Sequence, residues 1–491
     1  MSEQIRHNCG LCVAYDLHDA YSFIRDLQHR GREATGIAAI SDRRIDVIKW
    51  AGGVERFHID DLHKIFPANI NNYHVFMAHV RYATQGRKDI ESVLQDAHPH
   101  VLGGTAKNRG NHIMVYGCEA AIVHNGQVNT EYLKDISNNV LKTDCDSEAL
   151  LHLIIKNGEQ DLIEKIPGAF TLAFTDRRKG GGIVVLRDKL GMRPGVLGWK
   201  DGKHCIASEK TALLKNGARF VKELEPGYAH YLSSNGSYWS QMVSQANPQH
   251  CFFEWNYLLD PESVFNRAHV TNVREFLGEE LAEEFKPSDV DIVTFLPNCP
   301  EAAARAYANK LELPFKHVFY KMRKERSFQG STQEERRSSI QQNLYLIPEI
   351  DGVPAGESLK DKVIVVVDDS TVRGTNSPRA RYLLYEEAKI KKAYLANYTP
   401  PLGIIGEDNI PRGCLFGVDM APGDSFIAIN PSTEKNRTLE EISDTIGMDV
   451  VYLSQEGMFR AFERAGISRQ NLCHYCIGGP HPFEQKSITD F

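Results

Sequence analysis

The sequence predicts two domains of different fold class, an α+β domain followed by an α/β domain. Strand signals cluster between Gly168 and Met242, with one amphipathic helix on each side, which is typical of sheets stacked between helical layers. After Cys251 strands alternate with helices, a pattern that favours a parallel sheet. Five consecutive β-branched apolar residues, Val363 to Val367, predict a strand buried on both faces of that sheet.

Length and composition restrict the classes of protein that fit. A chain of 491 residues is too long for one core and predicts two to four domains. The net charge of −7 argues against a nucleic-acid partner, which normally meets a basic surface. No apolar run approaches the ~20 residues of a membrane helix, and the first eight residues lack a signal peptide's apolar core, so we expect a cytoplasmic protein without a membrane partner.

The first domain is predicted from short elements and polar motifs. A helix carries Ala20, Phe23, Ile24 and Leu27 on one face. The expected strand pairs are 37–40 with 45–50, 171–175 with 182–186, and 228–232 with 238–242. Polar motifs at 28–36, 79–86, 124–127 and 144–148 lie at the ends of predicted strands and helices, and 243–250 is the best linker.

The second domain is predicted from alternating elements. We expect a helix capped by Thr271 and running through Phe285, and then a strand at 291–296, a helix at 300–311 and a strand at 317–321. The stretch 321–339 is charged and nearly devoid of aliphatic residues, so it predicts a mobile solvated loop.

Two carboxylates stand at the carboxyl end of the predicted buried strand. Ligands of open α/β sheets bind at that edge, so Asp368 and Asp369 are expected to face a crevice. The glycine-containing loop Arg373–Asn376 leads into a predicted helix at 379–388, and the N–H groups of such a loop can hold a phosphate. Acids and a phosphate loop together indicate a sugar phosphate. The alternative is a strand that ends in a solvated acidic turn.

The stretch from Asp368 to Thr375 resembles the phosphoribosyl pyrophosphate (PRPP) signature of type I phosphoribosyltransferases, most closely that of the amidophosphoribosyltransferase family. The resemblance implies Mg²⁺ on Asp368 and Asp369, and a lid over PRPP that contains Arg323 and Arg326. In the loop Asn298–Glu301, only Glu301 offers an anion where the family has acidic and hydroxyl groups. The implied PRPP-binding residues are Asp368, Asp369, Ser370, Thr371, Arg373, Gly374, Thr375, Asn376, Arg323 and Arg326.

The order of the first-domain motifs resembles the N-terminal-nucleophile (αββα) glutaminase domain of the same family. It implies removal of residues 1–8 as a propeptide, which makes Cys9 the first residue and its α-amino group the base for its own thiol. By the same resemblance, Arg81 and Thr84 hold the carboxylate of glutamine and Asp146 its ammonium group, and Arg30 lies in the loop covering the nucleophile. Asn125 and Gly126 match the oxyanion-hole donors.

Ten cysteines in a reducing compartment point to a nucleophile, metal ligands or core positions. Cys473 and Cys476 form a CxxC, which by itself fits a redox pair, half a zinc site or chance. Cys251 and Cys414 fall where one branch of the family carries the other ligands of a [4Fe–4S] cluster. The resemblance therefore implies a structural [4Fe–4S] cluster on all four, with Zn²⁺ as the alternative.

The implied organisation is a propeptide (1–8), a glutamine amidotransferase domain (9–242), a phosphoribosyltransferase domain (251–470) and a tail with cluster ligands (471–491). The implied reaction transfers ammonia from L-glutamine to PRPP, giving 5-phosphoribosylamine, the first step of purine synthesis. We expect a homo-oligomer inhibited by purine nucleotides. The alternatives are a non-catalytic relative that senses nucleotides, a PRPP enzyme with another acceptor, and a metal-stabilised scaffold protein.

Overall fold

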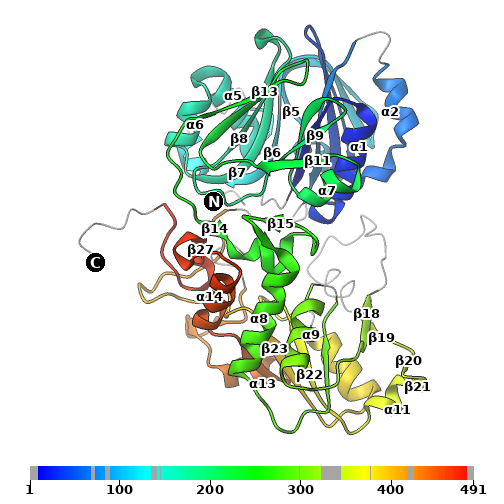
Figure 1. The fold of residues 1–491 in the computed structure, drawn as a ribbon, viewed down its shortest axis with the longest axis vertical. Helices are drawn as coiled ribbons and strands as arrows, with labels where there is room; N and C mark the ends of the chain where they lie inside the picture. Colours follow the sequence, from blue (N-terminus) through cyan, green and yellow to red (C-terminus); the bar gives the residue numbers. More distant parts are fainter. Residues whose placement is uncertain are drawn as a thin grey trace. The chain divides into compact units, whose positions relative to one another are not determined.

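The structure is a computed structural model, and it describes residues 9–67, 72–82, 89–133, 141–143, 145–297, 299–321, 344–375, 377–416, 418, 420 and 425–483. The chain forms two compact units (Figure 1). The first comprises Met1–Cys251, Ser263–Phe265 and Phe416–Asp419, and the second comprises Phe252–Glu262, Asn266–Leu415 and Met420–Phe491.

The strands of the first unit form one hydrogen-bonded path, β11-β9-β10-β1-β4-β2-β3-β6-β7-β8-β12-β13, with β5 added on β6. The strands are β1 (Gly10–Ala14), β2 (Ala34–Ile40), β3 (Ile45–Ala51), β4 (Val75–Arg81), β5 (His100–Asn108), β6 (His112–Val128), β7 (Gly168–Asp176), β8 (Ile183–Arg187), β9 (Val196–Lys200), β10 (Lys203–Ala207), β11 (Arg219–Glu223), β12 (Tyr228–Leu232) and β13 (Tyr238–Met242). The helices are α1 (Leu17–Asp26), α2 (Ile59–Ile65), α4 (Ile90–Asp96), α5 (Asp146–Asn157), α6 (Glu159–Lys165) and α7 (Lys210–Lys215).

Three apolar clusters divide this unit into layers. Because side chains alternate along a strand, β1 sends Leu11 and Val13 into a cluster built from strand side chains, and Cys12 and Ala14 into a second cluster with α1, α2 and α7. A third cluster joins α5 and α6 to β6, β7 and β8. Figure 1 shows α5 and α6 on one side of the strands, and α1 and α7 on the other. The predicted sheets between helical layers are confirmed.

The hairpins of the first unit have the expected pairings. β2 pairs with β3 from Ala34↔Ala51 to Ile40↔Ile45, and β12 pairs with β13 from Tyr228↔Met242 to Leu232↔Tyr238. β6 runs antiparallel to β7, with Asn125 opposite Thr171. The polar motif at 124–127 therefore lies within β6, where β7 pairs with it through the backbone.

A four-stranded parallel sheet forms the centre of the second unit, in the order β17 (Ile292–Phe295), β22 (Val363–Asp368), β23 (Lys392–Asn397) and β26 (Asp449–Tyr452). All six residues of β22 are buried, which confirms the predicted strand. The helices are α8 (Val270–Glu284), α9 (Glu301–Lys310), α11 (Ala355–Leu359), α12 (Ser377–Arg381), α13 (Leu439–Ile446) and α14 (Gln455–Arg464), and a π-helical turn (Tyr382–Glu387) continues α12.

Two details of the second unit differ from the prediction. Helix α8 begins at Val270, and Thr271 lies in its first turn, where its Oγ1 donates to Pro261 O at 2.8 Å instead of capping the helix. The strand expected at 317–321 is β18 (Phe319–Lys321), which pairs antiparallel with β19 (Leu344–Leu346) outside the parallel sheet. The hydroxyl of Thr271 is used by the contact with Pro261. The strand β18 pairs with β19, a nearby hairpin partner, instead of joining the parallel sheet. The charged loop predicted from residue 322 onward lies outside the described residues.

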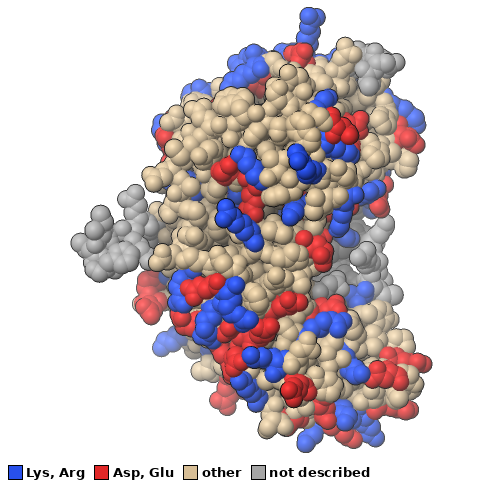
Figure 2. All heavy atoms as spheres, in the orientation of Figure 1, with Lys and Arg blue, Asp and Glu red and all other residues tan. Residues whose placement is uncertain are grey.

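Charged side chains of both signs are interspersed on the face drawn in Figure 2. Part of this pattern belongs to α8 and α14, where Arg460 pairs with Glu280 at 2.8 Å and with Glu284 at 2.9 Å. Within the described ranges, no helix combines the length and the apolar composition that a bilayer crossing requires.

Candidate functional site

The thiol of Cys9 is fully buried just before β1 and lies close to three guanidinium groups. Burial raises the pKa of this thiol to about 11, although the backbone N–H of Tyr82 and the charges of Arg81, Arg30 and Arg193 favour the thiolate. The thiol is therefore protonated at neutral pH. A nucleophilic role requires a nearby base to take its proton.

Arg30 is fixed beside Cys9 by a buried ion pair. Its Nε donates to Cys9 O at 3.0 Å and its Nη1 donates to Glu209 Oε1 at 2.8 Å. The same carboxylate contacts His29 Nε2 at 2.8 Å and accepts from Ser263 Oγ at 2.7 Å. Burial opposes ionisation of Glu209, but His29 and Arg30 hold its pKa well below the usual range. Sequence reasoning missed Glu209, because nothing near position 209 signals a partner 179 residues away.

Asn125 and Gly126 lie on β6 in the interior of the first unit. The side chain of Asn125 is fully buried, and neither its Nδ2 nor its Oδ1 has a hydrogen-bond partner among the described residues. An unpaired buried amide typically costs about 1–3 kcal/mol. Gly126 has φ +149°, and a Cβ there would lie 2.0 Å from Ala169 O, so only glycine fits. The pair is an unsatisfied donor beside a backbone with no side chain, which suits a ligand oxygen.

Asp146 is the first residue of α5 and is nearly buried. Its Oδ2 accepts from Val128 N at 3.2 Å, and its Oδ1 accepts from Ser147 Oγ at 3.1 Å. His124 Nδ1 lies 3.7 Å from the same Oδ1. These contacts fix the carboxylate in a low-dielectric interior, where it can attract an ammonium group strongly.

Arg81 ends β4 and is buried between two carboxylates. Its Nη1 donates to the carboxylate of Glu33, and its Nη2 donates to Asp96 Oδ2 at 3.4 Å. Burial raises the pKa of Glu33, against the opposing charge of Arg81. A ligand carboxylate at Arg81 would therefore compete with protein carboxylates. Thr84, the other residue predicted to hold a carboxylate, lies outside the described residues.

Asp368 and Asp369 lie at the carboxyl edge of the parallel sheet, each 9% exposed. Asp369 N donates to Asp368 Oδ1 at 3.0 Å, and Ser370 Oγ donates to Asp369 Oδ2 at 2.7 Å. Burial raises the pKa of Asp369 to about 6. Burial and the charge of Asp369 raise the pKa of Asp368 well above its usual value. The surroundings therefore do not stabilise two full negative charges on this pair, and a bound cation would favour the ionised form of both carboxylates.

Two cations that sequence reasoning missed act on this pair. The guanidinium of Arg274 and the ammonium of Lys321 both favour the ionised form of Asp369. Arg274 is buried in α8, where its Nε donates to Trp255 O at 2.8 Å and its Nη2 donates to Leu259 O at 3.0 Å. Lys321 ends β18. An arginine in a helix and a lysine at a strand end are common on surfaces, so their residue types gave no signal.

The loop after the acid pair is fixed to its neighbours at its start. Thr371 Oγ1 donates to Asn397 Oδ1 of β23 at 2.7 Å, and Val372 O accepts from Ile427 N at 2.9 Å. Gly374 has φ +67°, and a Cβ there would lie 2.8 Å from Ile427 Cδ1. This conformation suits a loop whose N–H groups meet an anion. Arg373 and Thr375 belong to the described part of the loop, and Asn376 does not.

The loop before α9 contributes little anionic charge. The carboxylate of Glu301 lies 2.8 Å from Arg305 Nη2 and 3.4 Å from His317 Nε2. Cys299 Sγ donates to Tyr257 O at 3.5 Å, and burial raises the pKa of its thiol to about 11. The acid pair is therefore the main oxygen ligand set for a cation in this part of the unit.

The predicted cluster cysteines belong to both units. Cys251 is the last residue of the long first segment, whereas Cys414, Cys473 and Cys476 belong to the second unit. Cys473 ends β27 (Leu472–Cys473), and Cys476 lies in the following turn, where its carbonyl accepts from Gly403 N at 2.9 Å. Arg323 and Arg326, the predicted lid residues, lie outside the described residues.

The two units define the class of protein. A buried thiol beside a fixed arginine, with an unpaired buried amide in the same unit, suits acyl transfer from glutamine. An acid pair with a phosphate-type loop at a parallel sheet edge suits a phosphoribosyl donor. Residues 104–259 match the family model of the glutamine amidotransferase domain. The protein is thus a glutamine amidotransferase joined to a phosphoribosyltransferase-like domain.

Full-length relatives give the particular family. Amidophosphoribosyltransferases of Archaeoglobus fulgidus and Bacillus subtilis are each 29% identical to the chain; the alignments cover 94% and 98% of it, and 94% and 95% of those proteins. A solved structure of the allosteric regulatory enzyme of purine biosynthesis matches with a TM-score of 0.76 at 26% identity, over 98% of this chain and 97% of that one. The B. subtilis enzyme complexed with ADP and GMP also matches with a TM-score of 0.76 at 26% identity, over 97% of both chains. The chain belongs to the amidophosphoribosyltransferase family.

The raised pKa of Asp369 predicts how cation binding depends on pH. The carboxylate loses its charge as the pH falls through about 6, so the affinity for Mg²⁺ in the presence of PRPP should fall about tenfold for each pH unit below that value. Calorimetric titration of the full chain above and below pH 6 measures this change. The Asp369→Asn variant should bind Mg²⁺ weakly at both values, and equal affinities of the unmodified protein at both would contradict the assignment.

Proposed function

We propose that the protein transfers ammonia from glutamine to PRPP, giving 5-phosphoribosylamine, glutamate and pyrophosphate, the first step of purine synthesis. The observation that carries this proposal is the similarity of both units, over nearly the full length, to amidophosphoribosyltransferases. The site residues add independent chemical support, because one unit has the groups for glutamine cleavage and the other has the groups for a phosphoribosyl donor.

The first half-reaction uses Cys9 as the nucleophile. After removal of residues 1–8, the α-amino group of Cys9 takes the thiol proton as Sγ attacks the amide carbon of glutamine. Asn125 Nδ2 and Gly126 N donate to the oxyanion that forms, which gives the unpaired amide of Asn125 its partner. Collapse of this intermediate expels ammonia and leaves a thioester, which water hydrolyses to glutamate.

Glutamine is held by its charged end. Asp146 accepts the α-ammonium group, and Arg81 with Thr84 holds the α-carboxylate. Because Glu33 and Asp96 already contact Arg81, the substrate carboxylate takes the place of one of them. Arg30, fixed by Glu209, closes the loop over the nucleophile. This arrangement ties glutamine binding to the loop that excludes water.

The second half-reaction takes place at the sheet edge of the second unit. Mg²⁺ on Asp368 and Asp369 would neutralise the diphosphate of PRPP. The loop from Ser370 through Thr371, Arg373, Gly374 and Thr375 to Asn376 holds the 5′-phosphate, and Arg323 and Arg326 cover the site from the lid. Ammonia attacks C1 of the ribose as pyrophosphate leaves, and the acid pair favours the positive charge that develops on the ring.

The remaining parts of the proposal concern cofactors, partners and location. Four thiolates on Cys251, Cys414, Cys473 and Cys476 form a donor set that fits a structural [4Fe–4S] cluster, with Zn²⁺ as the alternative. The proposed domains are 1–8, 9–242, 251–470 and 471–491. Purine nucleotides as inhibitors are supported by the B. subtilis enzyme complexed with ADP and GMP. We also propose that the protein forms a homo-oligomer and is located in the cytoplasm.

The decisive test is pyrophosphate release from PRPP by the purified full chain with Mg²⁺ and either glutamine or free ammonia. We expect release with both, and an intact mass that begins at Cys9. The Cys9→Ser variant should lose the glutamine-dependent reaction and keep the ammonia-dependent one. A protein inactive with ammonia in excess would contradict the proposal and leave a nucleotide sensor or a PRPP enzyme with another acceptor.

Asn125 provides a sharper test of the glutamine half. Removing one oxyanion donor typically lowers kcat about 10²–10³-fold. The Asn125→Ala variant should therefore lose this much glutaminase kcat, with little change in the KM for glutamine or in the ammonia-dependent rate. The matched control is Asn157→Ala, at an exposed position at the end of α5. A KM increase without a fall in kcat would assign Asn125 to substrate binding instead.

A further inference from the structure

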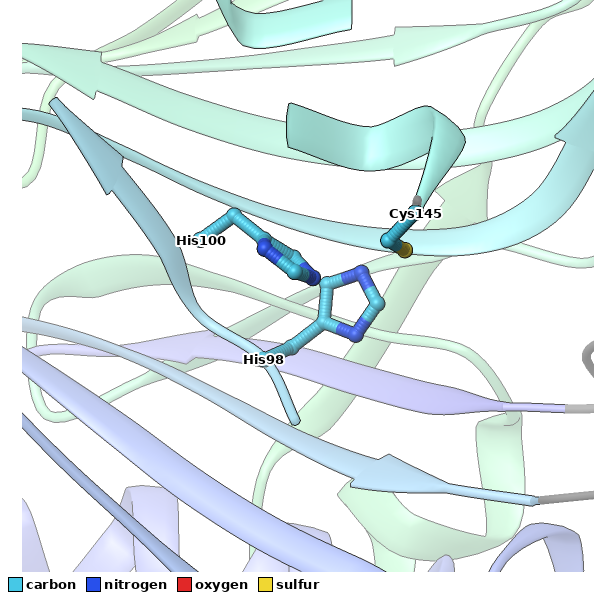
Figure 3. Close-up of side chains that lie close together, drawn as sticks. All are labelled: His98, His100 and Cys145. Carbon is cyan, nitrogen blue, oxygen red and sulfur yellow. The ribbon is translucent and has the colours of Figure 1, made fainter. Parts of the chain in front are cut away.

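Two histidines and a cysteine, none of them a predicted cluster ligand, converge inside the first unit (Figure 3). His98 lies two residues before His100, which opens β5, and Cys145 directly precedes α5. Their side chains are buried, with exposures of 1%, 3% and 1%. One ligand atom from each lies within 4.8 Å of the other two. We propose that His98, His100 and Cys145 bind a divalent cation of the zinc class.

The donor set selects the class of metal. Two imidazole nitrogens and one thiolate suit Zn²⁺ or Co²⁺, whereas Mg²⁺ and Ca²⁺ prefer oxygen ligands. Bonds of about 2.0–2.3 Å to a tetrahedral zinc ion hold its donors about 3.3–3.7 Å apart. The three atoms, within 4.8 Å of one another, therefore need to move by only about 1 Å. The fourth position is left for water or a neighbouring carboxylate oxygen.

The surroundings of the cluster can release His98 to a metal. His98 Nε2 contacts Ser147 Oγ at 2.9 Å, and that hydroxyl also contacts His124 Nδ1 at 2.9 Å and donates to Asp146 Oδ1 at 3.1 Å. Ser147 thus keeps two partners if His98 turns to an ion. The ring of His98 packs edge-on against that of His100, with centroids 4.7 Å apart. The ring of His98 also packs against that of His79, with centroids 4.1 Å apart, so its ring is held between two neighbours.

The local charge also favours a cation. Besides burial, the pKa of Lys49 is affected by the charges of Asp96, Glu148 and Arg81. Besides burial, the pKa of the Cys145 thiol is affected by the charges of Asp146, Asp96 and Arg81. With Glu33, which pairs with Arg81, four carboxylates face two cations, so the surroundings are net negative. A zinc ion that displaces the thiol proton to solvent adds a net single positive charge, which offsets part of this negative charge. The free-energy cost of burying the bound ion is then small compared with the cost of burying an unpaired charge.

The proposed ion would join two elements that chain connectivity leaves far apart. His98 and His100 lie just before and at the start of β5, and Cys145 is the residue before α5. A metal bridge between them would hold the N-terminus of α5 against the sheet and stabilise the first unit. Metal removal should therefore lower the melting temperature of that unit.

The test measures zinc in the full chain after equilibration with Zn²⁺ and removal of excess ion. The unmodified protein should carry one more equivalent of zinc per chain than Cys145→Ser or His100→Gln. Cys118→Ser is the matched control, because Cys118 is also a buried thiol of the first unit but lies outside the cluster. It should keep the unmodified zinc content. Added Zn²⁺ should raise the melting temperature of the unmodified protein and the control only.

The predicted cluster cysteines are present in every variant, so any metal they hold cancels in these differences. X-ray absorption at the zinc edge of the unmodified protein should show mixed nitrogen and sulfur ligands. Equal zinc contents in all four proteins, or sulfur ligands alone at the zinc edge, would overturn the proposal. If Cys145→Ser does not fold, His100→Gln and the absorption spectrum of the unmodified protein decide the question.

Discussion

The second unit is organised around two adjacent carboxylates that are buried at the end of a parallel strand. Burial of like charges is unfavourable, and it raises the pKa of both Asp368 and Asp369. The pair remains in place because β22 is the second of four parallel strands and because Arg274 and Lys321 offset part of its charge. In the proposed reaction, the negative charge that these cations leave uncompensated would attract Mg²⁺ and its phosphoribosyl donor. The unfavourable charge of the ligand-free protein is therefore a source of ligand affinity.

In the first unit, an uncharged polar group, the side-chain amide of Asn125, is likewise buried in an unfavourable environment that a ligand can relieve. Asn125 is held in the interior with both polar atoms unpaired, at a typical cost of about 1–3 kcal/mol. An oxyanion formed next to it would recover that free energy only as the reaction proceeds, which is the condition for catalysis rather than tight substrate binding. The paired Arg81 differs, because Glu33 and Asp96 stabilise it before any ligand arrives. Binding and chemistry thus depend on different local electrostatics.

The sequence predicted the parts of this protein that depend on local pattern. The apolar run Val363–Val367 fixes the place of β22 in the sheet, and the hairpin of β12 and β13 follows from a turn between two strand signals. The acid pair was found because it follows the apolar run at the carboxyl end of a predicted strand, and Asn125 was found through the resemblance of its motif to the glutaminase family. Both features lie in short stretches of sequence.

Long-range partners were not predictable in this way. Glu209 accepts a hydrogen bond from Arg30, which lies 179 residues earlier in the chain. The charge of Arg274 favours the ionised form of Asp369, although the sequence pattern of its helix indicates only packing. Nothing near Cys145 in the sequence indicates a metal ligand, because the two histidines beside it lie some 45 residues earlier in the chain. Thr271 was expected to cap α8, and a tertiary contact to Pro261 took its hydroxyl instead. Each of these residues acquires its role only from folding.

Infrared difference spectroscopy of the carboxyl groups tests most directly whether the negative charge of Asp368 and Asp369, at the end of β22, is left uncompensated in the ligand-free protein. Near pH 6 without Mg²⁺, the account predicts a protonated carboxyl band that disappears on addition of Mg²⁺ with PRPP and is absent from Asp369→Asn. A spectrum in which both carboxyl groups are ionised under those conditions, with no change on addition of the ligands, would contradict it.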